Sequence, residues 1–345
     1  MIRDAISTLS EGSSLTQKDA TEVMGEIMSG DTTEAQIGAF LTALRMKGET
    51  PEEIAGMATT MRKKALRVET NFDLIDTCGT GGDGSNSFNV STAAAVVAAS
   101  ANVCVAKHGN RAASGTCGSA DLLEALGVKI DLAPEGVKKC IETVGIGFMF
   151  APIFHPAMKH VAKPRKEMGI RTVFNILGPL TNPAGVKKQI IGIADKSQGE
   201  LLARVLGLLG SEHAMIVHGE DGLDEITISG KTNVWEIKNN EIQAYALDSK
   251  ELGVMANVLD EIKGESISDN VGMFRSVMEG KQGPCMDIVT LNAGAALYVA
   301  GAAGSIKDGR AIAEDCLKSG MAQAKIDQLI DVSQSIGIED KEQAY

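Results

Sequence analysis

The chain has 345 residues, and its 45 acidic and 33 basic side chains give a formal net charge of −12. This excess of negative charge disfavours nucleic acid or an anionic membrane surface as a partner. No apolar run reaches membrane-spanning length and the first residues have no signal-peptide core, so we expect no membrane partner and a cytoplasmic location. The six cysteines include no C-x-x-C pair, so neither a disulfide framework nor a zinc site is indicated.

The first sixty-odd residues carry several helix-start signals. Thr16 precedes one apolar periodic segment, and Thr33 with Gln36 has the spacing of a capping box before the next. The run Thr50 to Glu53 combines an N-cap, a proline at the first helical position and a glutamate at the third. Short, closely connected helices predict a small bundle, whose apolar face is expected to pack against the rest of the chain or a second copy. We therefore predict a homodimer formed through it.

From residue 72 onward, short apolar runs alternate with helical stretches. Strands are expected at 72–75, 103–106, 146–150, 190–193 and 214–217, and helices lie between them. Such alternation predicts a mostly parallel sheet with helices on its faces, and ligands then bind at the carboxyl ends of the strands. Two β-rich runs around Asn239-Asn240 predict an antiparallel hairpin at an edge, and 287–300 is expected to be a buried helix.

A glycine-rich loop follows the first of these strands. Gly79, Gly81, Gly82 and Gly84 occupy four of six positions, and a helix rich in alanine begins near Ser91. Without Cβ atoms the backbone N–H groups can turn toward a bound anion, and the helix N-terminus adds partial positive charge. The pattern predicts a seat for phosphate, in preference to a glycine-rich turn with no ligand.

The same glycines also match G-x-G-x-x-G, the dinucleotide-binding fingerprint. Three observations argue against that interpretation. The helix starts several residues after the last glycine, and Asp83 would repel a bare pyrophosphate unless a cation intervened. The next strand ends in Lys107-His108 instead of the acidic residue that would hold a ribose hydroxyl. An NAD site is therefore rejected.

Three further stretches contain candidate functional residues. Lys107 to Asp121 offers cations, an imidazole and small residues before a helix that Ser119 is expected to cap, which favours a second phosphate loop. The adjacent carboxylates Asp224 and Glu225 follow a strand, and together with Asp83 and phosphate they favour Mg²⁺. Between 148 and 183 the apolar residues are either a slot in which Arg165 meets a carboxylate or a helix-packing segment. No activated nucleophile stands out, so an enzyme here would work by positioning and electrostatics.

Four motifs in order resemble those of the anthranilate phosphoribosyltransferase family of tryptophan biosynthesis, over nearly the whole chain. They read GTGGDGSNSFNVSTAAA, KHGNRAASG with GSADLLEALG, HPAMKHVAKPRKEMGIRTVFNILGPLTNP, and VHGEDGLDEI. The resemblance implies a fold of the nucleoside phosphorylase and phosphoribosyltransferase type. In it, a helical dimerisation domain (1–68, completed by about 163–190) joins a large α/β catalytic domain (69–162 and 191–345) with a mostly parallel central sheet.

The resemblance also implies an activity, which is transfer of the phosphoribosyl group of phosphoribosyl pyrophosphate to the amine of anthranilate, with Mg²⁺ (two ions) and in a cytoplasmic homodimer. The contacts it implies for phosphoribosyl pyrophosphate are Gly79, Gly82, Asp83, Ser87, Asn89, Val90, Ser91, Thr92, Lys107, His108, Gly109, Asn110, Arg111, Ala112, Ala113, Ser114, Gly115 and Ser119. The implied anthranilate contacts are Gly79, Asn110 and Arg165, and the implied metal ligands are Ser91, Asp224 and Glu225. Gly115 and Cys117 stand where relatives often have serine, so only backbone contacts to phosphate are expected there.

Two other functions remain open at this point. A nucleoside phosphorylase of the same fold would need a site for free phosphate and no metal pair, which Asp224 and Glu225 disfavour. A non-catalytic phosphate-binding protein would keep the glycine loop without needing the acidic pair or the slot around Arg165. No residue is assigned as a general base, and His108 is the candidate.

Overall fold

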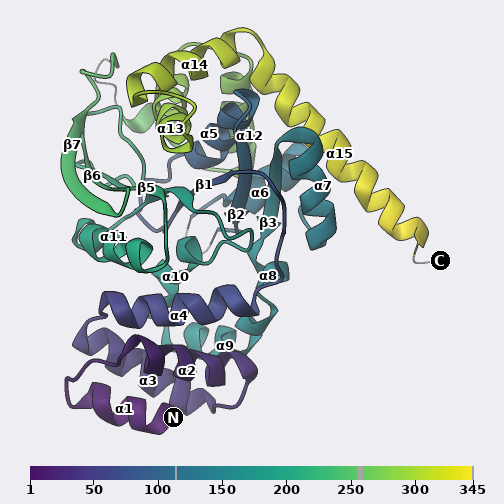
Figure 1. Ribbon diagram of the computed structural model, residues 1–345. Helices are drawn as coiled ribbons and strands as arrows, with labels where there is room; N and C mark the ends of the chain where they lie inside the picture. Colours follow the sequence, from purple (N-terminus) through teal and green to yellow (C-terminus); the bar gives the residue numbers. More distant parts are fainter. Residues whose placement is uncertain (113–114, 255–258, 344–345) are drawn as a thin grey trace.

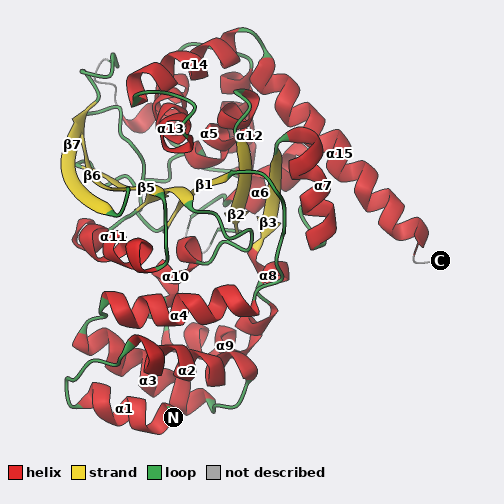
Figure 2. Cartoon of the chain, viewed as in Figure 1, coloured by secondary structure: helices red, strands yellow, loops and turns green. Residues whose placement is uncertain are grey.

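The computed structural model describes residues 1–112, 115–254 and 259–343. A helical bundle lies at one end of the molecule, and a twisted sheet with helices on both faces forms the rest (Figure 1; Figure 2). The bundle begins with α1 (Ile2–Ser10), α2 (Gln17–Ser29), α3 (Glu34–Lys47) and α4 (Pro51–Lys64). This arrangement agrees with the fold class predicted from the sequence.

The three threonine start signals are confirmed as capping boxes. At Thr16, Thr33 and Thr50, the side-chain oxygen accepts the N–H three residues later, and that residue's side chain accepts the threonine N–H. Each box satisfies two backbone donors that a helix start otherwise leaves unpaired. The sequence could predict these helices because the signals are local.

A later segment returns to the bundle. It contains α8 (Ala151–Phe154), the 3₁₀ turn η1 (Pro156–Met158), α9 (Lys159–Met168) and α10 (Phe174–Leu180). In Figure 1, α9 lies against α2 and α3, and α10 lies between the bundle and the sheet. The segment expected to complete the bundle, about 163–190, includes most of α9 and all of α10, and its last residues, 188–190, belong to a strand.

The described residues form a sheet of seven strands in the order β3-β2-β1-β4-β5-β6-β7. The first five strands are parallel and the last two are antiparallel. Their bounds are β1 (Leu74–Gly79), β2 (Cys104–Gly109), β3 (Ile146–Phe150), β4 (Lys188–Gly192), β5 (His213–Gly219), β6 (Lys231–Lys238) and β7 (Glu241–Asp248). The order reverses beside β1, because the chain runs outward to β3 on one side and to β7 on the other. The crevice outside the carboxyl ends of strands at such a point is the expected place for a ligand.

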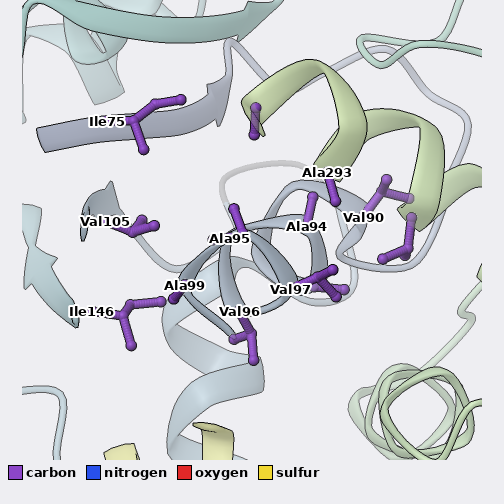
Figure 3. Packing of buried hydrophobic residues seen from close by; sticks show 14 of the residues in the cluster. Ile75, Val90, Ala94, Ala95, Val96, Val97, Ala99, Val105, Ile146 and Ala293 are labelled. Carbon is purple, nitrogen blue, oxygen red and sulfur yellow. The ribbon is translucent and has the colours of Figure 1, made fainter. Parts of the chain in front are cut away.

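One face of the sheet is covered by an alanine-rich layer. Here α5 (Val90–Ser100) packs on α13 (Pro284–Ala300), and Figure 3 shows its alanines beside Ile75, Val105 and Ile146 of three strands. Small side chains let these helices approach closely, so the start of α5 is held rigidly by packing. The outer helices of this half are α6 (Ser119–Leu126), α7 (Pro134–Val144), α12 (Ile267–Met278), α14 (Ile306–Lys318) and α15 (Met321–Gln343).

The opposite face shares its core with the helical bundle. On β5, Met215 and Val217 join the first cluster, while Ala214 and Ile216 join a second cluster that also contains the bundle residues. This alternation is the period of two expected of a strand buried on both faces. Between bundle and sheet lies α11 (Gly199–Leu208), which packs on α4 after the 3₁₀ turn η2 (Lys196–Gln198). Part of the bundle's apolar face is therefore covered by this same chain.

The predicted hairpin at the edge is confirmed. Asn239 and Asn240 both have positive φ, 52° and 64°, as a tight two-residue turn requires. Glu236 anchors this edge: its carboxylate lies 2.7 Å from His213 Nε2 and accepts hydrogen bonds from Tyr245 (2.6 Å) and Tyr298 (2.9 Å). Burial raises the pKa of Glu236, but these donors outweigh it and bring the pKa down to about 2.

Among the described helices, none has the length and apolar character needed to cross a bilayer.

Candidate active site

The glycine loop leaves the carboxyl end of β1 and returns to the start of α5. Gly81, Gly82 and Gly84 have φ of 65°, 75° and 75°, a left-handed conformation that residues with a Cβ adopt at a cost. Thr80 donates its N–H to the carbonyl of Gly192 at the end of β4 (2.8 Å), which ties the loop to the neighbouring strand. The glycines thus allow a left-handed backbone path that residues with a Cβ adopt at a cost.

The acidic pair lies directly beside this loop. Asp224 Oδ2 accepts the N–H of Gly81 at 3.0 Å, and Glu225 Oε1 accepts the N–H of Ser91 at 3.1 Å. Residues more than 130 positions apart in the sequence are therefore joined at both ends of the loop. A Cβ on Gly192 would overlap the carbonyl oxygen of Asp224 and would lie 2.5 Å from its carbonyl carbon, so glycine is needed for this approach.

Three carboxylates crowd one side of the loop. Burial, with a further contribution from the charge of Asp83, raises the pKa of Asp224 to about 6. Burial and the charge of Asp224 raise the pKa of Glu225 well above its usual range. Asp83 Oδ1 accepts the N–H of Ser85 (3.2 Å), while its Oδ2 is buried without a partner. A cation placed among these oxygens would relieve both the repulsion and the missing partner.

The chemistry of these groups fits magnesium. All the candidate ligands are oxygen atoms, which Mg²⁺ prefers, and a hydroxyl (Ser91) lies next to the Glu225 contact. Within the described parts of the chain, no three His, Cys, Asp or Glu side chains form a ready-made metal cluster. The remaining ligands would then be water and substrate phosphate, the usual arrangement for this ion. A cavity of about 320 Å³ adjoins Asp83 and extends toward 221–223 and 259–263.

The second predicted phosphate loop begins at the end of β2. Lys107 is buried, and its ammonium donates to the carbonyl of Thr77 (2.6 Å) and reaches the hydroxyl of Ser91 (3.5 Å). Burial lowers the pKa of Lys107, whereas the nearby carboxylates of Asp76 and Glu225 oppose this change. Lys107 therefore lies beneath the glycine loop, where it adds positive charge to the floor of the site.

The other loop cation, Arg111, is engaged by acidic neighbours. Its guanidinium donates to Asp121 (2.8 Å) and Glu124 (2.8 and 3.1 Å) and lies 5.6 Å from the ring centroid of Phe150. Asp121 also accepts the N–H groups of Ala112 (3.0 Å) and Gly118 (2.9 Å), so it holds both ends of the loop. The predicted contacts Ala113 and Ser114 lie outside the described residues.

The expectation that Ser119 caps the following helix is wrong. Ser119 is the first residue of α6 and Gly118 is its N-cap, with Asp121 accepting the Gly118 N–H. The Ser119 hydroxyl instead donates to the carbonyl of Asn110 (3.3 Å). A backbone that needs glycine at the cap overrides the side-chain preference, which sequence propensity alone does not register.

The residues expected to line the acceptor slot lie on β2 and on the returning segment. Arg165 on α9 stacks over Phe174 with 5.1 Å from its guanidinium carbon to the ring centroid, and burial lowers its pKa. His108 and His155 face each other with centroids 5.0 Å apart, and the Nε2 atom of each is buried without a partner. Burial is the main cause that lowers their pKa values, to about 3 for His108 and about 4 for His155. Both rings are thus neutral at pH 7.

Two residues that the sequence reasoning missed contact the loops. Arg171, between α9 and α10, donates to the carbonyls of Gly82 (3.2 Å) and Gly81 (3.3 Å). Asn270 on α12 accepts hydrogen bonds from Asn89. Nothing in the local sequence marks either residue, because an arginine in a connection between two helices and an asparagine in a helix are both ordinary.

Comparison with known proteins agrees with this geometry. Two sequence families match the chain: "Glycosyl transferase family, a/b domain" over residues 71–323, and "Glycosyl transferase family, helical bundle domain" over 3–65. The fold and the site therefore define a glycosyl transferase with a helical bundle and an α/β domain.

Curated relatives are more specific. Anthranilate phosphoribosyltransferase of Dehalococcoides mccartyi is 52% identical over 338 residues, which cover 97% of this chain and 99% of the relative. The enzyme of that name from Acetivibrio thermocellus is 52% identical over 336 residues, 97% of each chain. This chain belongs to the anthranilate phosphoribosyltransferase family.

Solved structures support the same assignment. Anthranilate phosphoribosyltransferase of Thermus thermophilus has a TM-score of 0.91 at 43% identity, covering 96% of this chain and 99% of that one. The Saccharomyces cerevisiae enzyme, solved in complex with phosphoribosyl pyrophosphate and magnesium, has a TM-score of 0.89 at 30% identity, covering 97% and 98%.

Proposed function

We propose that this chain transfers the phosphoribosyl group of 5-phosphoribosyl 1-pyrophosphate to the amine of anthranilate. The products are N-(5-phosphoribosyl)anthranilate and pyrophosphate, in a step of tryptophan biosynthesis. The observation that carries the proposal is the pair of bonds that joins Asp224 to Gly81 and Glu225 to Ser91. It brings an acidic pair, a glycine loop and a helix N-terminus together at the carboxyl ends of the strands, where a charged diphosphate can be held.

The two phosphate loops supply the seat for phosphoribosyl pyrophosphate. The glycine loop lacks Cβ atoms at four positions, so a phosphate can approach its backbone closely, and the dipole of α5 adds positive potential at its first turn. Lys107 places a cation beneath them. We assign to this seat the eighteen residues that the family resemblance implies, including the ends of the second loop that Asp121 holds.

Asp224, Glu225 and Ser91 would hold magnesium, with two ions as the proposed number. Bound there, the metal would neutralise charge on the pyrophosphate leaving group. The unpartnered Asp83 Oδ2 and the raised pKa values of Asp224 and Glu225 support a cation at this place. Without one, these carboxylates would repel the substrate that the loop amides attract.

Anthranilate is proposed to contact Gly79, Asn110 and Arg165. Among the described residues, no acidic side chain forms an ion pair with Arg165, so its guanidinium is free to receive the substrate carboxylate. The aromatic amine is neutral at pH 7 and needs placement more than deprotonation. A pKa of about 3 makes His108 a weak base, so we assign no general base.

The test follows the fluorescence of anthranilate in the presence of phosphoribosyl pyrophosphate, with and without Mg²⁺. We expect a magnesium-dependent loss of fluorescence with the purified chain. The variant Asp224→Asn with Glu225→Gln should lose activity by at least about 100-fold while its circular dichroism stays unchanged, because it removes the charge that holds the metal. Normal turnover by this folded variant would reject the metal assignment.

The same assay separates the alternatives. A nucleoside phosphorylase would release base from thymidine or uridine with free phosphate, and would leave anthranilate unchanged. A non-catalytic phosphate-binding protein would bind phosphoribosyl pyrophosphate in a calorimeter without consuming it. Either result would overturn the proposal.

Assembly, domain division and location complete the proposal. We assign dimerisation to the helical bundle (1–68, with the returning segment) and catalysis to the α/β domain. Met46, whose surface is 83% exposed, is one apolar residue available for contact at the bundle surface. A single species of monomer mass in sedimentation equilibrium at micromolar concentration would refute the dimer. The cytoplasmic location is consistent with six free cysteines, because a reducing compartment keeps thiols unpaired.

A further inference from the structure

A segment far along the chain pairs with the returning limb of the glycine loop. Phe88 donates its N–H to the carbonyl of Ile262 (2.8 Å), and Gly264 donates its N–H to the carbonyl of Asn86 (2.9 Å). Between these bonds, Ser87 and Lys263 form an antiparallel bridge. Residues 262–264 therefore support the loop from outside, immediately before α12 begins.

Asn270, one turn into α12, is the buried centre of this contact. Only 1% of its surface is exposed. Its Oδ1 accepts the backbone N–H of Asn89 (3.2 Å) and the side-chain Nδ2 of Asn89 (3.0 Å). Its own Nδ2 donates to the carbonyls of Gly264 (3.3 Å) and Ser266 (2.9 Å). Every hydrogen-bonding position of the amide is thus used, and because one end meets only donors and the other only acceptors, its orientation is defined.

The same contacts reach the second phosphate loop. Asn89 Nδ2 also donates to the carbonyl of Cys117 (3.1 Å), and the hydroxyl of Thr116 donates to the carbonyl of Gly264 (2.9 Å). One buried amide therefore connects Asn89 of the first loop, residues 116–117 of the second loop and the 262–266 segment. Both loops are tied at the side where α5 begins.

These bonds also determine what Asn89 does. Asn89 is the N-cap of α5, a position where an asparagine side chain ordinarily accepts an N–H of the first helical turn. Here it makes no such bond, and its Nδ2 instead donates to Asn270 Oδ1 and to the carbonyl of Cys117, which orients the side chain toward these partners. The first turn of α5 is consequently left to Glu225, which accepts the Ser91 N–H, and to ligand phosphate.

We propose that Asn270 is a positioning residue that sets the spacing between the two phosphate loops and directs Asn89 away from capping α5. It touches no substrate and acts through Asn89, so it should govern the affinity for the diphosphate substrate more than that for the acceptor. This inference rests on the proposed function of the loops as the seat for phosphoribosyl pyrophosphate.

The test measures steady-state kinetics of Asn270→Ala, with calorimetric binding of phosphoribosyl pyrophosphate and Mg²⁺. We expect KM for phosphoribosyl pyrophosphate to rise about tenfold, while KM for anthranilate changes less than about twofold. Because Asn270 acts through Asn89, the double variant Asn89→Ala with Asn270→Ala should bind no more weakly than Asn89→Ala alone.

Ser333→Ala is the matched control. Ser333 is fully buried on α15, accepts the N–H of Lys129 (3.0 Å) and donates to the carbonyl of Ile330 (3.0 Å). Its loss should lower the thermal midpoint without changing either KM. If Asn270→Ala behaves as this control does, or if its effect adds to that of Asn89→Ala, the positioning role is refuted.

Asn270→Asp keeps the test decisive if the alanine variant does not fold. A carboxylate retains an oxygen for Asn89 but cannot donate to Gly264 and Ser266. The KM of this variant for phosphoribosyl pyrophosphate should therefore fall between those of the wild type and an Asn89→Ala variant. A KM equal to the wild type would exclude the role of the two donors. The calorimetric measurement needs no acceptor, so it remains valid even if the wild-type chain proves inactive toward anthranilate.

Discussion

Gly192 provides the sharpest test of how the site is held together. A Cβ at this position would overlap the carbonyl oxygen of Asp224 and would lie 2.5 Å from its carbonyl carbon. Two carbon atoms need about 3.5 Å, so in Gly192→Ala the Asp224 backbone must withdraw by at least about 1 Å. A displacement of about 1 Å in a positioning group costs about 100-fold in rate, equivalent to about 2.7 kcal/mol of transition-state stabilisation. We therefore expect kcat/KM to fall by at least about 100-fold.

Two further glycine variants calibrate this result. In Gly79→Ala the Cβ would lie 2.5 Å from Asp224 Oδ2, which must shift less than the Asp224 backbone does in Gly192→Ala, so the loss should be smaller, about tenfold. Gly207→Ala, on α11 with no heavy atom within 4 Å of the added carbon, should leave activity unchanged and slightly raise the thermal midpoint. The assay is magnesium-dependent anthranilate consumption, with circular dichroism to confirm the fold. A folded Gly192→Ala chain within twofold of wild-type kcat/KM would refute the argument.

Three other predictions follow from single contacts. Arg165→Ala should raise KM for anthranilate by about 30-fold, the equivalent of about 2 kcal/mol for a lost charged hydrogen bond, and a change confined to phosphoribosyl pyrophosphate would contradict the carboxylate role. Arg171→Ala removes the hydrogen bonds to the carbonyls of Gly81 and Gly82 and should raise KM for phosphoribosyl pyrophosphate a few-fold. The control is Lys163→Ala, which removes an exposed cation paired with Glu34 and should leave this KM unchanged. Glu236→Gln should destabilise the fold by about 2 kcal/mol at pH 7 in urea unfolding. Because the folded pKa of Glu236 is lowered to about 2, its stabilisation is complete above the unfolded value near 4.5 and is lost as pH falls toward 2. An undiminished difference between variant and wild type at pH 3 would contradict this assignment.

Local patterns determined much of this protein by themselves. The three capping boxes, the Asn239-Asn240 turn, the alternation of strands and helices, and the glycine loop were all readable because each depends on residues within a few positions of one another. The motifs of the family resemblance likewise lie in continuous stretches. Residue types that are rare outside such settings, such as four glycines in six positions, carry the information without any tertiary context.

Only the tertiary structure decided which distant residues meet. The approach of Asp224 to Gly81 and the contacts of Arg171 and Asn270 with the glycine loop and Asn89 all depend on strand order and helix packing. The same is true of the neutral pair His108 and His155, whose pKa values follow from burial. A hydrogen bond between residues 143 or 181 positions apart leaves no local trace, because its energy depends on three-dimensional distance and solvent exclusion.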